Sequence, residues 1–425
     1  MATLAKHHDR KTRVKTIAGI TIGNAIEFYD FAIYSVFAVL IGTLYFPGES
    51  DFVKLMLTFA TFGVGFLTRP LGALVIGLYA DRHGRRPAMF LTLMLMGVGT
   101  LIFVVTPTYA QIGMAAPILI VLGRLIQGFA IGGELGASTT MLMEYADDHS
   151  RGFYGSWQLF GQALSTMLGA LVGLVLGSLL SDAQLASWGW RLAMFLGLAV
   201  VPFALYIRRS LPETRPADGH KEHSSLGVLF RDHSRLLLAG VLITMGGTVA
   251  NFIVLNYMMN YAISVLKLPF SSSIWAAFLA AGVQLLLIPF AGMLSDRVGR
   301  KKVVFWARVP LILLIYPMFA WISDTATVAV LLWAVLILSI FLALNSGPSV
   351  VLCAEIFPAH VRATGLSLVY SLGVMLFGGF AQMIATGLIQ LTGSPNAPAF
   401  YLIVTGVLSL GGLLLVRETA GRPLS

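Results

Sequence analysis

Long apolar runs dominate this sequence and limit the chain to folds that cross a membrane. An α-helix of about 20 apolar residues spans the hydrocarbon core of a bilayer. The chain is 57% hydrophobic and only 11% charged, with a mean hydropathy of +0.84, which excludes an ordinary soluble domain. We therefore predict an all-α polytopic membrane protein with about twelve spans, near residues 17–45, 52–80, 88–107, 113–144, 152–180, 190–208, 235–263, 272–295, 303–322, 327–354, 362–391 and 397–417.

The distribution of basic residues predicts the orientation of these spans. The formal net charge of +9 is spread over short clusters between apolar runs, so it indicates topology and no nucleic-acid partner. Of the 28 lysines and arginines, 22 fall on the side of the N-terminus, three on the other side and three within spans. Positive charge marks cytoplasmic loops. We expect both termini in the cytoplasm, an uncleaved first span, and a multi-pass protein of the cell inner (plasma) membrane.

A repeated motif indicates that one half of the chain is a copy of the other. The segment "GLYADRHGRR" (77–86) returns as "GMLSDRVGRK" (292–301), which places Asp81 and Asp296 215 residues apart. Glu144 and Arg151 recur 211 residues later as Glu355 and Arg362. We predict a six-helix bundle at 1–208, a cytoplasmic linker at 209–235 and a second six-helix bundle at 236–425. Both bundles start from the same side, so a pseudo-symmetry axis lies along the membrane normal.

The motifs and their order resemble the major facilitator superfamily over nearly the whole chain. The doubled motif and "GRLIQGF" (123–129) carry this resemblance. Four further segments are similar to its metabolite:proton symporter family: "GNAIEFYDF" (23–31), "FLTRPLGAL" (66–74), "AIGGELGAS" (130–138) and "AEIFPAHVRATG" (354–365). The stretches 152–162 and 376–393 look most like the citrate and tricarballylate proton symporters. The resemblance implies the major facilitator fold and transport by alternating access.

The resemblance also implies a gating role for the charges of the repeated motif. Asp81 and Asp296 would face the positive N-terminal end of a helix in the other half, while arginines pair with Glu144 and Glu355. Such contacts close the cytoplasmic side, and their loss opens it. The alternative is that these charges only anchor the topology. The predicted gating residues are Gly77, Asp81, Arg82, Gly84, Arg85, Glu144, Arg151, Asp296, Arg297, Gly299, Arg300, Glu355 and Arg362.

Ionisable side chains inside apolar spans are the first candidates for a functional site, because charge is costly there. In the first span Asn24, Glu27, Asp30 and Tyr34 follow a helical spacing and share one face. The fourth span carries Arg124, Gln127 and Glu134 on one stripe. If the two helices are neighbours, as the resemblance implies, one cation and three acids point into a common cavity.

This residue set suits the carriage of an anion together with a proton. Arginine offers a carboxylate a fixed bidentate partner, so Arg124 is our first choice for the substrate contact. A coupling proton needs an acid that can be neutralised, and burial favours the neutral form of a carboxyl group. Glu27, Asp30 and Glu134 are the candidates. The alternative is that Arg124 pairs permanently with one acid and only fixes helix packing.

Further polar residues would complete a substrate pocket or hold helices together. We expect pocket residues on the first, fourth, fifth, seventh and ninth spans: Asn24, Gln127, Gln158, Gln162, Asn256, Tyr257, Tyr261 and Arg308. Buried amides also link helices, and part of this set has that role. Arg69 and Arg308 lie near span ends, where arginine can snorkel to the cytoplasmic side. Arg308 would alternatively supply a second cation to the substrate.

The sequence predicts a secondary transporter and no enzyme. All eight histidines fall in loops or terminal segments, and neither a Walker loop nor a hydrolase or zinc motif occurs. A single cysteine, Cys353, allows no four-thiol metal site, so we expect no cofactor and the proton gradient as energy source. The expected activity is proton symport of a di- or tricarboxylate, citrate first, into the cell by a monomer. Alternatives are an osmolyte or monocarboxylate symporter and, remotely, a transport-inactive sensor.

Overall fold

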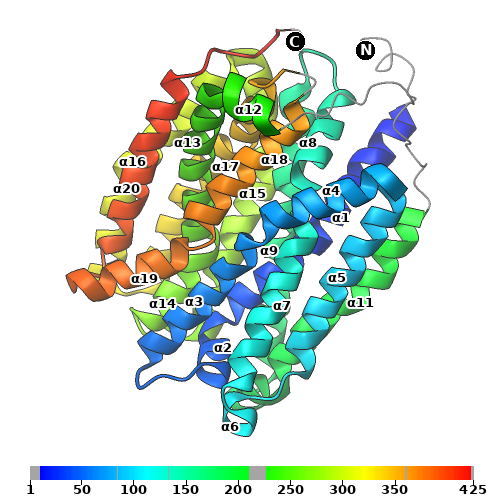
Figure 1. The fold of residues 1–425 in the computed structure, drawn as a ribbon. Helices are drawn as coiled ribbons and strands as arrows, with labels where there is room; N and C mark the ends of the chain where they lie inside the picture. Colours follow the sequence, from blue (N-terminus) through cyan, green and yellow to red (C-terminus); the bar gives the residue numbers. More distant parts are fainter. Residues whose placement is uncertain (1–9, 84, 133, 210–225, 359–360, 423–425) are drawn as a thin grey trace.

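Two groups of helices that follow each other along the chain lie side by side in the computed structural model (Figure 1). The structure describes residues 10–83, 85–132, 134–209, 226–358 and 361–422. These ranges contain helices and no β-strand. Most of the expected linker, 209–235, lies outside them, so the boundaries of the two bundles stay a prediction. The first group is called the N-terminal half below and the second the C-terminal half.

The N-terminal half consists of long helices joined by short ones. Helices α5 and α11 form its outer edge (Figure 1). Its elements are α1 (Arg10–Val36), α2 (Ala38–Tyr45), α3 (Asp51–Leu67), α4 (Arg69–His83), α5 (Arg85–Val105), α6 (Tyr109–Ile112), α7 (Ala115–Ile131), α8 (Glu134–Glu144), α9 (Arg151–Leu179), α10 (Asp182–Gln184), the π-helix η1 (Leu185–Gly189) and α11 (Trp190–Arg209).

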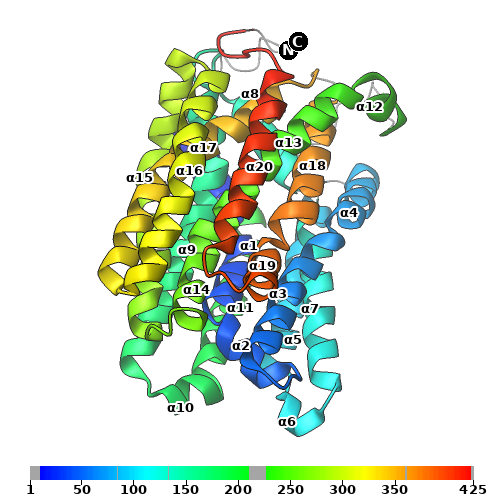
Figure 2. The same ribbon diagram turned by 90° about the vertical axis from the view of Figure 1, so that its left-hand side faces the viewer.

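The C-terminal half has the same general construction, with α16 and α20 at the opposite edge of the molecule (Figure 1). The segment that follows α20 lies at the end of the bundle away from α6 and α10 (Figure 2). Its elements are α12 (Leu226–Asp232), α13 (Ser234–Asn251), η2 (Phe252–Tyr257), α14 (Met258–Ser264), α15 (Phe270–Val298), α16 (Arg300–Thr325), α17 (Val328–Glu355), α18 (Arg362–Gly373), η3 (Val374–Gly378), α19 (Ala381–Thr392) and α20 (Ala397–Leu414).

The predicted membrane spans coincide with helices. Each apolar run is one helix or a set of helices that follow each other end to end. By length and composition, eight helices among the described residues qualify as spans, and α1 with α2 forms a ninth with a 68° bend. The helices 90–105 and 115–131 are apolar but shorter. The chain is an all-α polytopic membrane protein, as predicted.

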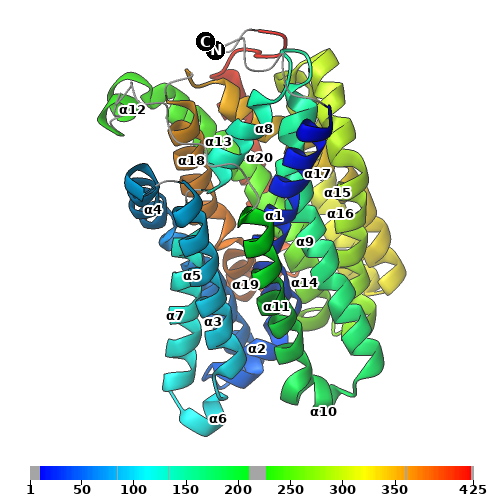
Figure 3. The same cartoon turned by 90° about the vertical axis from the view of Figure 1, so that its right-hand side faces the viewer.

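Helices α9 and α15 join the two halves through the most extensive helix contact in the described part of the chain. They run side by side when the molecule is turned (Figures 2 and 3). Gly152 and Gly292 permit this approach, because a Cβ atom on Gly152 would lie 2.5 Å from the carbonyl oxygen of Gly292. Gly292 is the first glycine of the second motif copy. It therefore has a packing role between the halves.

Two π-helical turns, η2 and η3, interrupt the spans of the C-terminal half. Such turns occur often at functional sites because they turn side chains out of the regular helical positions. Turn η2 contacts α1 and α17, and η3 contacts α3 and α13. Both turns therefore lie near the junction of the halves, where the candidate site is found.

Candidate functional site

A hydrogen-bonded network in the N-terminal half joins the candidate cation to a candidate acid. The Arg124 guanidinium donates to Gln127 Oε1 at 2.9 Å, and Gln127 Nε2 donates to Asp30 Oδ2 at 3.2 Å. The hydroxyl of Thr100 also donates to Asp30. These residues come from α7, α1 and α5, and all are buried. The uncharged amide of Gln127 thus links the positive charge of Arg124 to the negative charge of Asp30.

Aromatic rings surround the Arg124 guanidinium. Its central carbon lies 3.9 Å from the ring centre of Tyr34, 4.8 Å from that of Phe31 and 4.9 Å from that of Phe103, with Phe62 at 5.9 Å. Ring faces attract cations and are worth more when water is excluded. The side chain is only 1% exposed, and its Nε has no hydrogen-bond partner among the described residues. The cage therefore holds the cation while leaving a donor unused.

Two small cavities lie between the halves, with volumes of about 40 and 30 Å³. Gln162 of α9, Asn251 and Phe252 line both of them. Phe31 and Phe62, two rings of the Arg124 cage, line the second cavity. About 10–15 Å³ of such volume holds one water molecule, so each cavity has room for a few waters and for no organic acid in this conformation. The halves must separate, and the two rings must move, before a substrate reaches Arg124.

Several predicted pocket residues instead link helices. Asn24 Nδ2 donates to the carbonyl oxygen of Gln158 at 2.5 Å, and the Gln158 side chain accepts from Ser138 at 3.0 Å. Gln162 behaves differently, because it lines both cavities and donates to the Tyr370 hydroxyl of the other half at 3.3 Å. Asn256 lines the second cavity.

The predicted tyrosines of the seventh span are buried. The Tyr257 hydroxyl accepts a hydrogen bond from Thr386 at 3.1 Å, and its ring packs edge-on against Phe59 of the other half. The Tyr261 ring packs against Phe319 within the C-terminal half, and its hydroxyl has no partner among the described residues. Tyr257 therefore takes part in the contact between the halves.

Arg69 and Arg308 do not snorkel, contrary to one of our expectations. Arg69 is 3% exposed and its guanidinium carbon lies 4.2 Å from the ring centre of Phe66. Arg308 is 1% exposed and donates to Ser409 and, at 3.3 Å, to the Ile243 carbonyl oxygen. Both side chains turn inward because aromatic faces and polar groups of neighbouring helices receive them there.

The other two candidate acids are less fully described. Glu27 is 3% exposed and interacts electrostatically with Arg69. The side chain of Glu134 lies outside the described residues. Asp30 is therefore the candidate proton carrier whose surroundings the structure describes in full.

Sequence reasoning missed a polar stretch in the tenth span, "NSGPS" (345–349), in the middle of α17. Asn345, Ser346 and Ser349 are buried there, and Ser346 and Ser349 line the first cavity. The signal was present: polar residues and Pro348 interrupt an apolar helix, where such residues usually have a function. Thr100 and Tyr370, also missed, carry no comparable signal.

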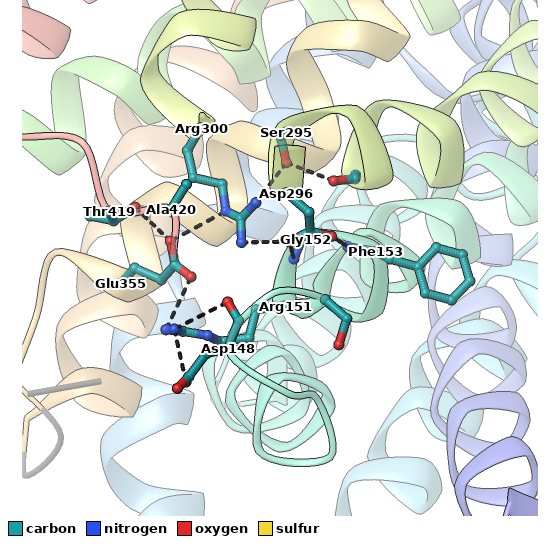
Figure 4. Close-up of polar contacts among 12 residues, drawn as sticks. Asp148, Arg151, Gly152, Phe153, Ser295, Asp296, Arg300, Glu355, Thr419 and Ala420 are labelled. Carbon is teal, nitrogen blue, oxygen red and sulfur yellow. Dashed lines mark hydrogen bonds and ion pairs between the residues drawn. The ribbon is translucent and has the colours of Figure 1, made fainter. Parts of the chain in front are cut away.

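A charge cluster lies at the end of the bundle that carries the C-terminal tail (Figure 4). It consists of Asp148, Arg151, Asp296, Arg300 and Glu355. The Asp296 carboxylate accepts hydrogen bonds from the backbone nitrogens of Gly152 and Phe153, both at 2.9 Å, at the start of α9. An anion is favoured at a helix N-terminus. Asp296 thus lies where we expected it, against a helix of the other half.

Glu355 lies between two arginines of the charge cluster. Its carboxylate is 3.3 Å from Arg151 of the N-terminal half and 3.4 Å from Arg300 of its own half. Arg300 also contacts Asp296 at 2.7 Å. The side chains of Glu355, Arg151 and Arg300 are at most 2% exposed, whereas Asp148, the second partner of Arg151, is 59% exposed. Only the Arg151–Glu355 pair connects the halves, so it alone among the ion pairs seen here breaks when they separate.

The segment after α20 adds contacts to the charge cluster. Thr419 donates to Glu355 at 2.5 Å, and the Arg422 carbonyl oxygen accepts from Arg151. Glu418 accepts from the backbone nitrogen of Arg300 at 2.7 Å. It lies close to Gly299, whose φ of 119° suits glycine because it has no Cβ.

The remaining predicted gating residues are described less fully. Arg297 is exposed and Arg362 is buried. The side-chain surroundings of the first motif copy and its partner lie outside the described residues: Gly77, Asp81, Arg82, Gly84, Arg85 and Glu144. For all gating residues the role stays a prediction.

The chain matches a known protein family and the fold of solved structures. The family model of the Major Facilitator Superfamily matches residues 20–381 and, in a second match, residues 236–424. The chain belongs to the major facilitator superfamily. The resemblance that the motifs indicated is therefore confirmed. Its fold is also that of solved transporters: the proton:xylose symporter XylE bound to 6-bromo-6-deoxy-D-glucose superposes with a TM-score of 0.79 at 17% identity, over 98% of both chains.

Named relatives cover almost the full length of the chain. A citrate-proton symporter of Salmonella typhi is 36% identical over 98% of both chains. A citrate-proton symporter of Klebsiella pneumoniae is 35% identical over 94% of this chain and 90% of the relative. A proline/betaine transporter of Escherichia coli K12 is 31% identical over 98% of this chain and 85% of the relative. These relatives are transporters, and none is named as an enzyme.

Proposed function

We propose that this protein is a proton-coupled symporter that imports a di- or tricarboxylate, citrate first, by alternating access. The observation that carries the proposal is the buried chain of contacts from Arg124 through Gln127 to Asp30. In this proposal Arg124 is the permanent cation that binds a carboxylate, and Asp30 is the acid that takes up the proton. The names of the two most similar relatives described above support the choice of citrate.

The network couples proton and anion binding through charge. Protonation of Asp30 removes its negative charge and leaves Arg124 with an uncompensated positive charge in an apolar cage. A buried charge without a partner is costly, so a substrate carboxylate then binds more favourably. Coupling of this kind is reciprocal, and a bound anion in turn favours the protonated acid. The proton and the substrate anion therefore cross the membrane together more readily than either crosses alone.

The charge cluster supplies the gate of this cycle. It joins the halves at one end of the bundle while the aromatic contact of Phe59 with Tyr257 joins them elsewhere. Separation at one end exposes the central cavities to one side of the membrane. Alternating access follows if the two ends open in turn.

We further propose the setting in which the protein works. The excess of lysine and arginine on the side of the N-terminus supports cytoplasmic termini and insertion into the cell inner membrane. The proton gradient supplies the energy without a cofactor, and one chain contains both candidate charges, which supports a monomeric transporter in the lipid bilayer.

Uptake into proteoliposomes tests the proposal. Labelled citrate should accumulate inside vesicles with an imposed pH gradient, and a protonophore should abolish the accumulation. Equal uptake with and without the protonophore contradicts proton symport. Labelled proline and betaine are measured in parallel, because the similarity to proline/betaine transporters makes an osmolyte the second candidate substrate. Accumulation of proline but not of citrate would make an osmolyte the proposed substrate in place of citrate.

A further inference from the structure

Arg308 is a buried cation in the C-terminal half with uncharged partners. It is 1% exposed, and its guanidinium donates to the Ser409 hydroxyl and to the Ile243 carbonyl oxygen. No carboxylate among the described residues forms an ion pair with it, and its Nε has no hydrogen-bond partner there. A buried charge is normally paired. Arg308 can therefore receive an anion.

Asn345 presents a second unsatisfied group close to Arg308. The side chain is 0% exposed, and neither its Nδ2 nor its Oδ1 has a hydrogen-bond partner among the described residues. Buried amides are nearly always paired, so an amide with both ends free calls for an external partner. Because Nδ2 donates and Oδ1 accepts, that partner carries both an acceptor and a donor.

Gly247 of α13 is the point where these groups meet. A Cβ atom at Gly247 would lie 3.6 Å from Asn345 Nδ2, 3.7 Å from Arg308 Nη2 and 3.9 Å from Ser349 Oγ. Gly247 and Ser349 both line the first cavity. Ser349 Oγ lies 2.6 Å from the Asn345 carbonyl oxygen, to which it donates its hydrogen, so it can only accept from a ligand. The missing side chain of Gly247 leaves space among three polar groups at the cavity wall.

We propose that Arg308, Asn345 and Gly247 form a subsite for a hydroxycarboxylate group of the substrate. The carboxylate accepts hydrogen bonds from the guanidinium of Arg308 and from Asn345 Nδ2, and the substrate hydroxyl donates to Asn345 Oδ1. This subsite rests on the proposed function and narrows it. The cargo is a hydroxylated di- or tricarboxylate, with one carboxylate for Arg124 and another for Arg308, one from each half.

The first test adds a methyl group to the subsite. Alanine at position 247 fits, because its Cβ makes ordinary contacts, but it takes the space of the ligand. Gly282 of α15 is the matched control, since nothing lies within 4 Å of its Cβ position and the change in helix propensity is the same. We expect Gly247→Ala to raise the KM for citrate at least about tenfold with little change in kcat. An equal KM in Gly247→Ala and Gly282→Ala overturns the subsite.

The second test uses Asn345→Leu, which keeps the size of the side chain and removes its polar atoms. Replacing an unpaired buried amide should leave the unfolding temperature without citrate unchanged or raised. The wild-type protein should bind citrate about tenfold more tightly than tricarballylate, which lacks only the hydroxyl, and the variant should lose this preference. If Asn345 only packs helices, the unfolding temperature falls and the preference stays. An unchanged preference overturns the proposal even if Gly247→Ala fails to fold.

The two proposals fail in different ways. Wild-type vesicles that do not accumulate citrate under a pH gradient contradict the proposed function. Wild-type vesicles that accumulate citrate, together with variants that keep its affinity and its preference over tricarballylate, contradict the subsite alone.

Discussion

Replacing Glu355 by glutamine should release the end of the bundle that carries the charge cluster. The substitution keeps the shape of the side chain and removes the charge that faces Arg151 at 3.3 Å and Arg300 at 3.4 Å. Arg300 belongs to the same half as Glu355, so its contact with Glu355 persists when the halves separate. This contact therefore does not change the free-energy difference between the open and the closed state. Of the two ion pairs of Glu355, only the pair with Arg151 favours the closed state.

The size of the effect follows from this single contact. Breaking a buried ion pair costs about 3–5 kcal/mol and breaking an exposed one about 0–1 kcal/mol. The Arg151–Glu355 pair is almost fully buried, but Arg151 keeps its contact with Asp148, so we expect an intermediate loss. A loss of about 2 kcal/mol changes the ratio of open to closed molecules by about 30-fold, since about 1.4 kcal/mol corresponds to a factor of ten. Glu355→Gln should therefore populate the open state about 30-fold more.

The single cysteine provides the assay. Cys353 is 2% exposed and lines the first cavity, so a small thiol reagent reaches it only when the halves open. The labelling rate should rise about 30-fold in Glu355→Gln, in proportion to the open population. Asp148→Asn is the control, because Asp148 contacts Arg151 at 3.1 Å within the N-terminal half and is 59% exposed. Exposed pairs contribute little, so its rate should change less than about threefold. Similar rates in both variants would refute the reasoning.

The Arg124 network and the contact between α9 and α15 predict three further outcomes. Asp30→Asn should abolish accumulation driven by a pH gradient but preserve exchange of internal for external citrate, because the acceptor geometry for Gln127 remains; loss of both activities contradicts a proton-carrying role. Citrate should raise the melting temperature of the wild-type protein, and Arg124→Gln should abolish this shift while the variant stays folded; an unchanged shift removes Arg124 from the pocket. Gly292→Ala should lower the melting temperature markedly, because its Cβ meets the Gly152 backbone, whereas Gly411→Ala, with open space at its Cβ position, should not; equal melting temperatures would show that α9 and α15 can move apart at little cost.

Residues of one span contact different helices, and their spacing does not say which. The spacing of Asn24 and Asp30 predicts one shared helical face, yet Asn24 binds the backbone of α9, whereas Asp30 contacts Thr100 of α5 and Gln127 of α7. The face of a helix depends on local spacing, but the partner on that face depends on which helix lies opposite. Arg308 is a second example of a side chain whose direction the sequence does not determine. Its position near a span end allowed snorkelling, but its hydrogen bonds to Ser409 and to the Ile243 carbonyl oxygen hold it inside the bundle.

The positions of the spans, the duplicated motif and the family could be read from the chain because each depends on residues close together in sequence. Hydrophobic length sets a span, and spacing along a helix sets its polar face. The ring cage around Arg124, the meeting of Asn345 with Arg308 at Gly247, and the inter-half pair of Arg151 with Glu355 depend on contacts between distant segments. Such contacts arise from helix packing, in which a residue without a side chain, such as Gly247, matters as much as a charged one.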